Sequence, residues 1–151
     1  MKKRVFAATI FFLLAVFFCG AASAAGEKFV RVYRDNSYDM YLNTNALVQN
    51  RGVISCWIKV VLSDKGKAGL RQDLPAKYKQ ARIDYEMDYI VFDTNKSKYN
   101  VKMSSVYSEG KEIYREGSKK WLSLRSGTIA KTVADNISGY IQQKRNEKDN
   151  F

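Results

Sequence analysis

The stretch VISCWIKVVL, residues 53–62, has the clearest strand pattern in the chain and sets the fold class. Successive side chains point to opposite faces of a strand, so every second residue shares a face. The even positions are all apolar: Ile54, Cys56, Ile58, Val60 and Leu62. The odd positions carry a mixed set that includes Trp57 and Lys59. The pattern predicts a strand with one buried face, on which Cys56 is a small core thiol rather than a bridge between two chains.

A second long strand is predicted over residues 78–93. One of its faces is largely apolar and carries Ala81, Ile83, Tyr85, Met87, Tyr89 and Val91. The other face carries Arg82, Asp84, Glu86 and Asp88 and is expected to face solvent. The alternation is lost over residues 89–92, which indicates a β-bulge or a stretch covered on both faces.

Shorter strands are expected at residues 29–33, 38–42, 99–107 and 112–115, each next to turn-forming residues. Residues 63–77 separate the two long strands. They are polar and basic, and they contain two glycines and the single proline of the chain. This composition predicts a loop.

The last part of the chain has a helical pattern. Ile129, Val133, Ile137 and Ile141 recur every four residues and form one apolar stripe. Ser126 or Thr128 is suited to cap the start of this helix, and residues 147–151 are expected to fray. The predicted fold class is therefore α+β, an antiparallel sheet of five to six strands with one C-terminal helix packed on it.

The first residues have the features of a secretory signal peptide. A basic start at residues 2–4 precedes an apolar run at residues 5–18, and small residues 22–24 follow. A transmembrane anchor needs ~20 apolar residues, and this run is shorter. A lipoprotein modified at Cys19 is the other alternative, although two phenylalanines precede that cysteine. We expect residues 1–24 to be removed and residues 27–146 to form one domain without a transmembrane span.

Composition excludes several classes of chemistry. The chain has no histidine, so His-based triads and His-ligated zinc are absent, and two cysteines are too few for a Cys-rich metal site. No catalytic residue, metal ligand or cofactor is therefore predicted. The formal net charge is +11, and the basic residues are dense enough to favour an acidic protein, an anionic polysaccharide or lipid head groups as partner. Nucleic acid is not expected for an exported protein.

Two clusters of charged residues are candidate sites. The first is basic and consists of Lys65, Lys67, Arg71, Lys77 and Lys79. It is predicted either to bind an anionic polymer or to act as a solubilising loop. The second is the acidic row Asp84, Glu86 and Asp88. Alternate strand residues lie ~6.6 Å apart, a spacing that also occurs in glycosidase pairs and in calcium sites, but a solvent face explains this row more simply.

The order of motifs resembles the surface-adhesin E (Protein E-like) domain family, over residues 29–141. The chain has an Asp-containing turn at Asp35, Arg51-Gly52, and then a strand bearing Trp57. A long strand ending in Phe92-Asp93 follows, then a Tyr-Ser-Glu-Gly hairpin at 107–110 and a helix opened at 126–129.

The resemblance implies an exported antiparallel sheet with a packed C-terminal helix. The family's named member dimerises and binds host extracellular-matrix and plasma proteins. The leading prediction is thus a non-enzymatic binding module for a protein or envelope component, with homodimerisation as a further implication. The alternatives are an envelope or periplasmic protein that binds anionic polymer through its basic loop, and a hydrolase.

This chain differs from the family in one respect. Members often join helix to sheet by a disulfide from a cysteine after the Phe-Asp pair. Here Thr94 stands in that place, and the helix contains no cysteine. A disulfide of this kind stabilises by ~3–4 kcal/mol, so the helix is expected to depend on its apolar stripe alone.

Overall fold

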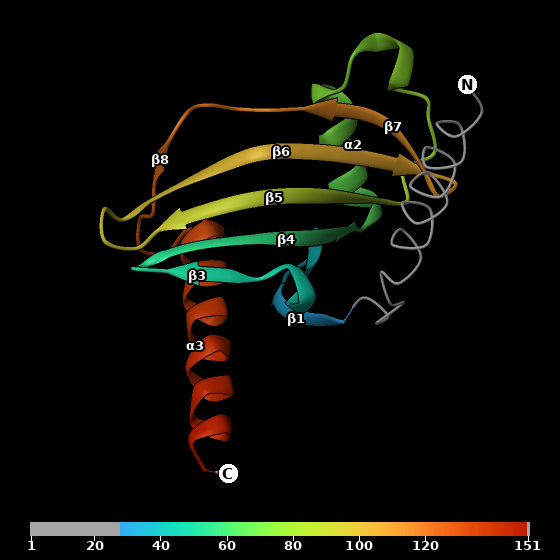
Figure 1. Cartoon of the computed structure of the whole chain (residues 1–151). Coiled ribbons are helices and arrows are strands. Elements are labelled where there is room, and N and C mark those ends of the chain that lie inside the picture. Colours follow the sequence, from blue (N-terminus) through green and yellow to red (C-terminus); the bar gives the residue numbers. More distant parts are fainter. Residues whose placement is uncertain (1–27, 151) are drawn as a thin grey trace, which may run out of the picture.

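The computed structural model describes residues 28–150, which form an eight-stranded antiparallel sheet with two α-helices (Figure 1). The α+β class is confirmed, with more strands than expected. The strands are β1 (Phe29–Arg34), β2 (Tyr38–Asn43), β3 (Val48–Asn50), β4 (Val53–Leu62), β5 (Tyr85–Asp93), β6 (Lys98–Ser108), β7 (Lys111–Glu116) and β8 (Leu122–Ser123). The helices are α2 (Asp64–Asp73) and α3 (Ile129–Asp149), with the 3-10 turns η2 (Thr44–Ala46) and η3 (Ala76–Tyr78). The strand order is β1-β2-β4-β5-β6-β7, with β3 beside β4 and β8 beside β6.

The helices pack on one face of the sheet and leave the other face without a helix within residues 28–150. The five even residues of β4 are at most 5% exposed, and they share one buried cluster with Leu74, Val133 and Ile137 from the segments that carry α2 and α3. The odd residues of β4 are half-buried or exposed. We call the helix side of the sheet the covered face, and we call the opposite side the open face.

Helix α3 begins as predicted from its cap and ends later. The Thr128 side chain accepts a hydrogen bond from the Lys131 backbone N–H at 3.3 Å, which satisfies one free donor of the first turn. The helix continues to Asp149, so residues 147–149 are helical rather than frayed. Asn136 also ties the helix to β1, because its amide donates to the Val32 carbonyl at 2.7 Å.

The predicted apolar stripe is only partly buried. Val133 and Ile137 are 2% and 0% exposed, and Ile141 is half-buried against the core. Ile129 is 37% exposed, so the expectation that all four positions seal the helix is corrected. It is the first residue of α3, directly after the Thr128 cap. Ala134, which the stripe did not include, is 3% exposed and belongs to the core.

The predicted loop at residues 63–77 is largely a helix, α2. The Ser63 hydroxyl caps it by accepting the Gly66 backbone N–H at 3.3 Å. Leu70 and Leu74 give the segment an apolar side that joins the core. A Cβ added to Gly66 would lie 2.4 Å from the Ser37 carbonyl oxygen, so this glycine lets α2 approach the sheet.

Strand β5 starts at Tyr85 rather than at residue 78, and its faces are reversed relative to the prediction. Antiparallel pairing sets Asp88 opposite Ile58 and Glu86 opposite Val60, which places both carboxylates on the covered face. Ile90 and Phe92 lie on the same face and fix this register through their packing in the core. The irregularity expected near residues 89–92 is a register shift against β6 between Tyr89 and Ile90.

The predicted signal peptide, including Cys19, lies outside the described residues. Within residues 28–150, none of the helices combines the length and apolar character needed to cross a bilayer. Cys56 is fully buried and unbonded, and burial raises the pKa of its thiol to about 12.

Candidate functional site

The open face carries a group of aromatic side chains next to cations and methionines. The strand register brings together residues from four central strands, all of them half-buried. They are Tyr41, Trp57, Lys59, Tyr85, Met87, Tyr89, Met103 and Tyr107. Because the helices of residues 28–150 pack on the other side, this face keeps its aromatic groups in partial contact with solvent.

The rings of the open face are held by one another. Trp57 and Tyr89 sit opposite each other on β4 and β5, with ring centroids 5.3 Å apart. Tyr85 and Tyr107 stack at 4.8 Å across β5 and β6. The Lys59 ammonium lies 4.3 Å from the Tyr85 ring centroid. Offset ring pairs and a cation over a ring are both attractive, so these side chains have fixed orientations before any partner arrives.

The charges around this group are mostly positive. Arg31 on β1 lies opposite Tyr41 and makes none of the ion pairs found among residues 28–150, and the same holds for Lys59. Arg115 on β7 is neutralised by Glu112, with which it shares a hydrogen bond of 3.1 Å. The unpaired cations give the open face a surplus of positive charge.

The covered face contains two carboxylates in an unusual setting. Burial, with the charge of Asp88 next to it, raises the pKa of Glu86 to about 7. Burial also raises the pKa of Asp88 to about 6, and Glu116 adds to this rise. The Ser104 hydroxyl partly offsets both shifts by hydrogen bonding, and its oxygen lies 3.5 Å from Glu86 Oε1. One oxygen of Asp88 is buried without a hydrogen-bond partner among the described residues.

A cavity of about 220 Å³ lies beside these acids, where β7 leaves β6. It is lined by Val101, Ser104, Glu116, Gly117 and Ser118. A carboxyl group with a pKa near 7 can exchange protons at neutral pH, but the cavity itself has a single carboxylate, that of Glu116. Within residues 28–150 there is no group of three potential metal-ligating side chains.

The predicted acidic row is not a single unit. Asp84 separates from the other two acids because it lies before β5 begins. Its carboxylate accepts the Glu109 backbone N–H at 2.6 Å and pairs with Arg82 at 3.0 Å. Asp84 thus fastens the β6–β7 turn, and only Glu86 and Asp88 share an environment.

The predicted basic cluster is divided by α2. Residues of a helix are rotated by ~100° each, so Lys67 and Arg71 share one side of the helix while Lys65 lies on another. Lys77 follows on η3, where its ammonium lies 4.6 Å from the Tyr78 ring centroid, and Lys79 comes directly after that turn. The structure therefore brings Lys67 and Arg71 together and leaves the other three cations dispersed.

The aromatic group of the open face was not among the predicted site residues. Alternation alone places Tyr85 and Tyr89 on the largely apolar face of the predicted strand, opposite the face that is expected to meet solvent. A signal for the correct assignment was present, since Ile90 and Phe92 share their face with the even residues of the strand.

Comparison with known proteins adds no assignment: no family model, no curated protein and no solved structure matches this chain.

Proposed function

We propose that this protein is an exported, non-enzymatic binding module that recognises a partner protein of the envelope or the extracellular matrix through its open face. The observation that carries the proposal is the pair of ring contacts, Trp57 with Tyr89 and Tyr85 with Tyr107, on a sheet face without a helix over it in residues 28–150.

The composition of the open face is that of a protein-recognition surface. Tyrosine, tryptophan, methionine and arginine are enriched in interfaces, and tryptophan and tyrosine are frequent among the residues that dominate binding energy. Stacked rings have few rotamers left to lose when a partner binds, which lowers the entropic cost of association. Trp57, near the centre of the sheet on β4, is the expected energetic centre.

Charge indicates the kind of partner. Arg31 and Lys59 are cations without a carboxylate among the described ion pairs, and both lie next to Tyr41 in the sheet register. A partner surface with an apolar centre and acidic residues at its rim would be complementary. The basic start and apolar run of residues 1–24 support export.

Substitutions on the two faces test the proposal. Purified protein is measured against a panel of immobilised extracellular-matrix and plasma proteins, at low and at high salt. Trp57→Ala and Tyr85→Ala on the open face are expected to weaken binding by roughly tenfold or more. Tyr114→Ala is the matched control, because Tyr114 is also half-buried and in ring contact, with Tyr78 at 5.7 Å, but belongs to the covered face.

Three results would contradict the proposal. The first is unchanged binding in Trp57→Ala, and the second is an equal loss in Tyr114→Ala. The third concerns self-association of the same variants, which sedimentation measures. If Trp57→Ala dissociates a homodimer and leaves binding to every panel protein as it was, then the open face is a contact between copies and not a recognition surface.

A further inference from the structure

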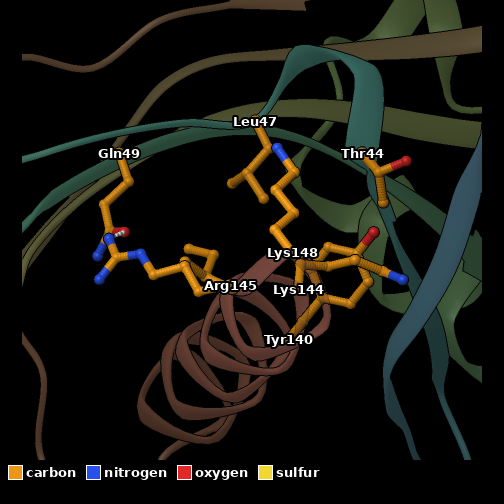
Figure 2. Close-up of a pocket in the computed structure, with 8 residues that line it drawn as sticks. Thr44, Leu47, Gln49, Tyr140, Lys144, Arg145 and Lys148 are labelled. Carbon is orange, nitrogen blue, oxygen red and sulfur yellow. Dashed lines mark hydrogen bonds between the residues drawn. The ribbon is translucent and has the colours of Figure 1, made fainter. Parts of the chain in front are cut away.

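A groove between α3 and the η2–β3 segment is lined by cations above an apolar floor. Its volume is about 330 Å³. One wall comes from Thr44, Leu47 and Gln49, and the other comes from Tyr140, Ile141, Lys144, Arg145 and Lys148 of α3. Figure 2 shows the side chains of Tyr140, Lys144, Arg145 and Lys148 rising from the helix towards the opposite wall.

The floor and one wall of the groove are fixed in place. Leu47, Tyr140 and Ile141 pack against the hydrophobic core. Arg145 donates a hydrogen bond of 2.7 Å to the Gln49 side-chain oxygen, which links the two walls (Figure 2). Thr44 is anchored because its hydroxyl donates to the Lys28 carbonyl at 3.0 Å. The site therefore exists before a ligand binds.

Positive charge exceeds negative charge at this groove. Lys144 forms an ion pair with Glu147, the one carboxylate seen in contact with the lining cations within residues 28–150. Arg145 and Lys148 make none of the ion pairs found there. The hydrogen bond from Lys144 lowers the pKa of Glu147, and the charge of Lys28 lowers it further, so Lys28 contributes to the same field.

We propose that this groove binds an acidic oligosaccharide, a sugar chain that carries sulfate or carboxylate groups on successive units. Lys144 and Lys148 are one helical turn apart, at ~6 Å along the axis, so the cations form a line that suits successive anionic groups. Arginine provides a planar fork for an oxyanion. Tyr140 and the aliphatic floor offer an apolar surface for a sugar ring, and Gln49 and Thr44 offer polar contacts. A concave groove with two walls suits an inserted chain better than a flat membrane surface.

The test uses a sulfated hexasaccharide as probe, with a neutral hexasaccharide that carries neither sulfate nor carboxylate as the ligand control, and measures affinity by calorimetry. The triple variant Lys144→Gln, Arg145→Gln, Lys148→Gln is expected to bind about tenfold more weakly. The control variant Lys111→Gln, Lys119→Gln, Lys120→Gln removes the same charge from exposed positions elsewhere and is expected to bind as the unmodified protein does. Binding is also expected to weaken as salt rises.

A single substitution is expected to change the affinity in the opposite direction. Glu147 competes with the ligand for Lys144, so Glu147→Gln is expected to tighten binding by roughly twofold or more. A merely structural role of the helix end would not produce this gain.

Several outcomes would overturn the proposal. One is an equal loss in both triple variants, which would show that only net charge matters. Another is a loss in Lys65→Gln, Lys67→Gln, Arg71→Gln with none in the groove variant, which would place the site on α2. A third is binding to vesicles of anionic phospholipid without binding to the hexasaccharide. Equal affinity for the neutral hexasaccharide would exclude an anion site altogether.

Discussion

The two faces of β5 contrast in an unexpected way. Its odd residues Tyr85, Met87 and Tyr89 lie on the open face, while Glu86 and Asp88 lie on the covered face, and all five are half-buried. In a half-covered sheet the apolar residues ordinarily face the core. β5 follows that rule only at its end, where Ile90 and Phe92 are on the covered face.

The two halves of this strand therefore have different roles. The Ile90–Phe92 half fixes the register by packing against β4. The Tyr85–Tyr89 half then has to turn its aromatic rings to the open face and its carboxylates to the covered face, because the two-residue period admits no other arrangement. Such a local conflict between pattern and fold is expected at functional positions.

The largest effect is expected at the centre of the covered face. Ile137 is 0% exposed, whereas Ile129 on the same predicted stripe is 37% exposed. Ile137→Ala is expected to lower the free energy of unfolding by ~3 kcal/mol, because it leaves a cavity in the core. Ile129→Ala, the matched control, should cost less than ~1 kcal/mol. Urea denaturation of both variants measures this, and equal losses would contradict the account of how α3 is held.

The two half-buried carboxylates of the covered face, Glu86 and Asp88, predict a pH dependence of stability. In the unfolded chain both groups titrate near pH 4, whereas in the fold the pKa of Asp88 is raised to about 6 and that of Glu86 to about 7. The folded protein then holds protons that the unfolded chain has released between these values. Its free energy of unfolding should therefore fall as the pH rises from ~4 to ~7.

Removal of these charges should reverse the loss. The double variant Glu86→Gln, Asp88→Asn is expected to be more stable than the unmodified protein at pH 8, by roughly 2 kcal/mol, and to lose less stability between pH 4 and pH 8. Glu112→Gln is the control, since Arg115 lowers the pKa of that exposed carboxyl and its removal should bring no gain. Denaturation curves at several pH values measure the free energy of unfolding of each variant. A less stable double variant at pH 8 would refute the placement of these acids.

Helix α2 gives a matched pair of glycines with opposite expectations. A Cβ at Gly66 would meet the Ser37 carbonyl oxygen, while a Cβ at Gly69 would meet nothing within 4 Å. Gly66→Ala should cost ~1–2 kcal/mol through crowding against the sheet. Gly69→Ala should stabilise by ~0.5–1 kcal/mol, because alanine is the better helix former. Thermal denaturation of both variants measures the signs, and a stabilising Gly66→Ala would show that α2 does not approach the sheet closely.

The smallest effect is expected on the open face. Lys59→Gln removes the cation that lies over the Tyr85 ring, and it should lower the free energy of unfolding by ~0.5–1 kcal/mol. Lys98→Gln, at an exposed position on β6, is the control and should be close to neutral. Urea denaturation at low salt compares the two. A Lys59→Gln variant as stable as the control would mean that the cation and the rings of the open face are not coupled.

The sequence predicted what depends on regular alternation and helical spacing. The apolar row of residues 54–62 and the C-terminal helix were both recognisable in this way. It failed where tertiary packing overrides a local pattern. The polar residues and two glycines of residues 63–77 predict a loop, and the helix α2 was missed. Its stability depends on the Ser63 cap and on the packing of Leu70 and Leu74 against the core. The faces of β5 depend on its pairing with β4, which alternation within β5 alone cannot show. The groove at α3 joins residues about a hundred positions apart, as Gln49 and Arg145 illustrate.

The orientation of β5 decides both faces of the sheet, because the same register that turns Glu86 and Asp88 to the covered face turns Tyr85 and Tyr89 to the open face. NMR titration of the side-chain carboxyl carbons of Glu86 and Asp88 in the folded protein tests it most directly. The expected midpoints lie near pH 7 for Glu86 and near pH 6 for Asp88. Midpoints near pH 4 for both would place these carboxylates in water, on the face assigned to the aromatic rings, and would contradict the account.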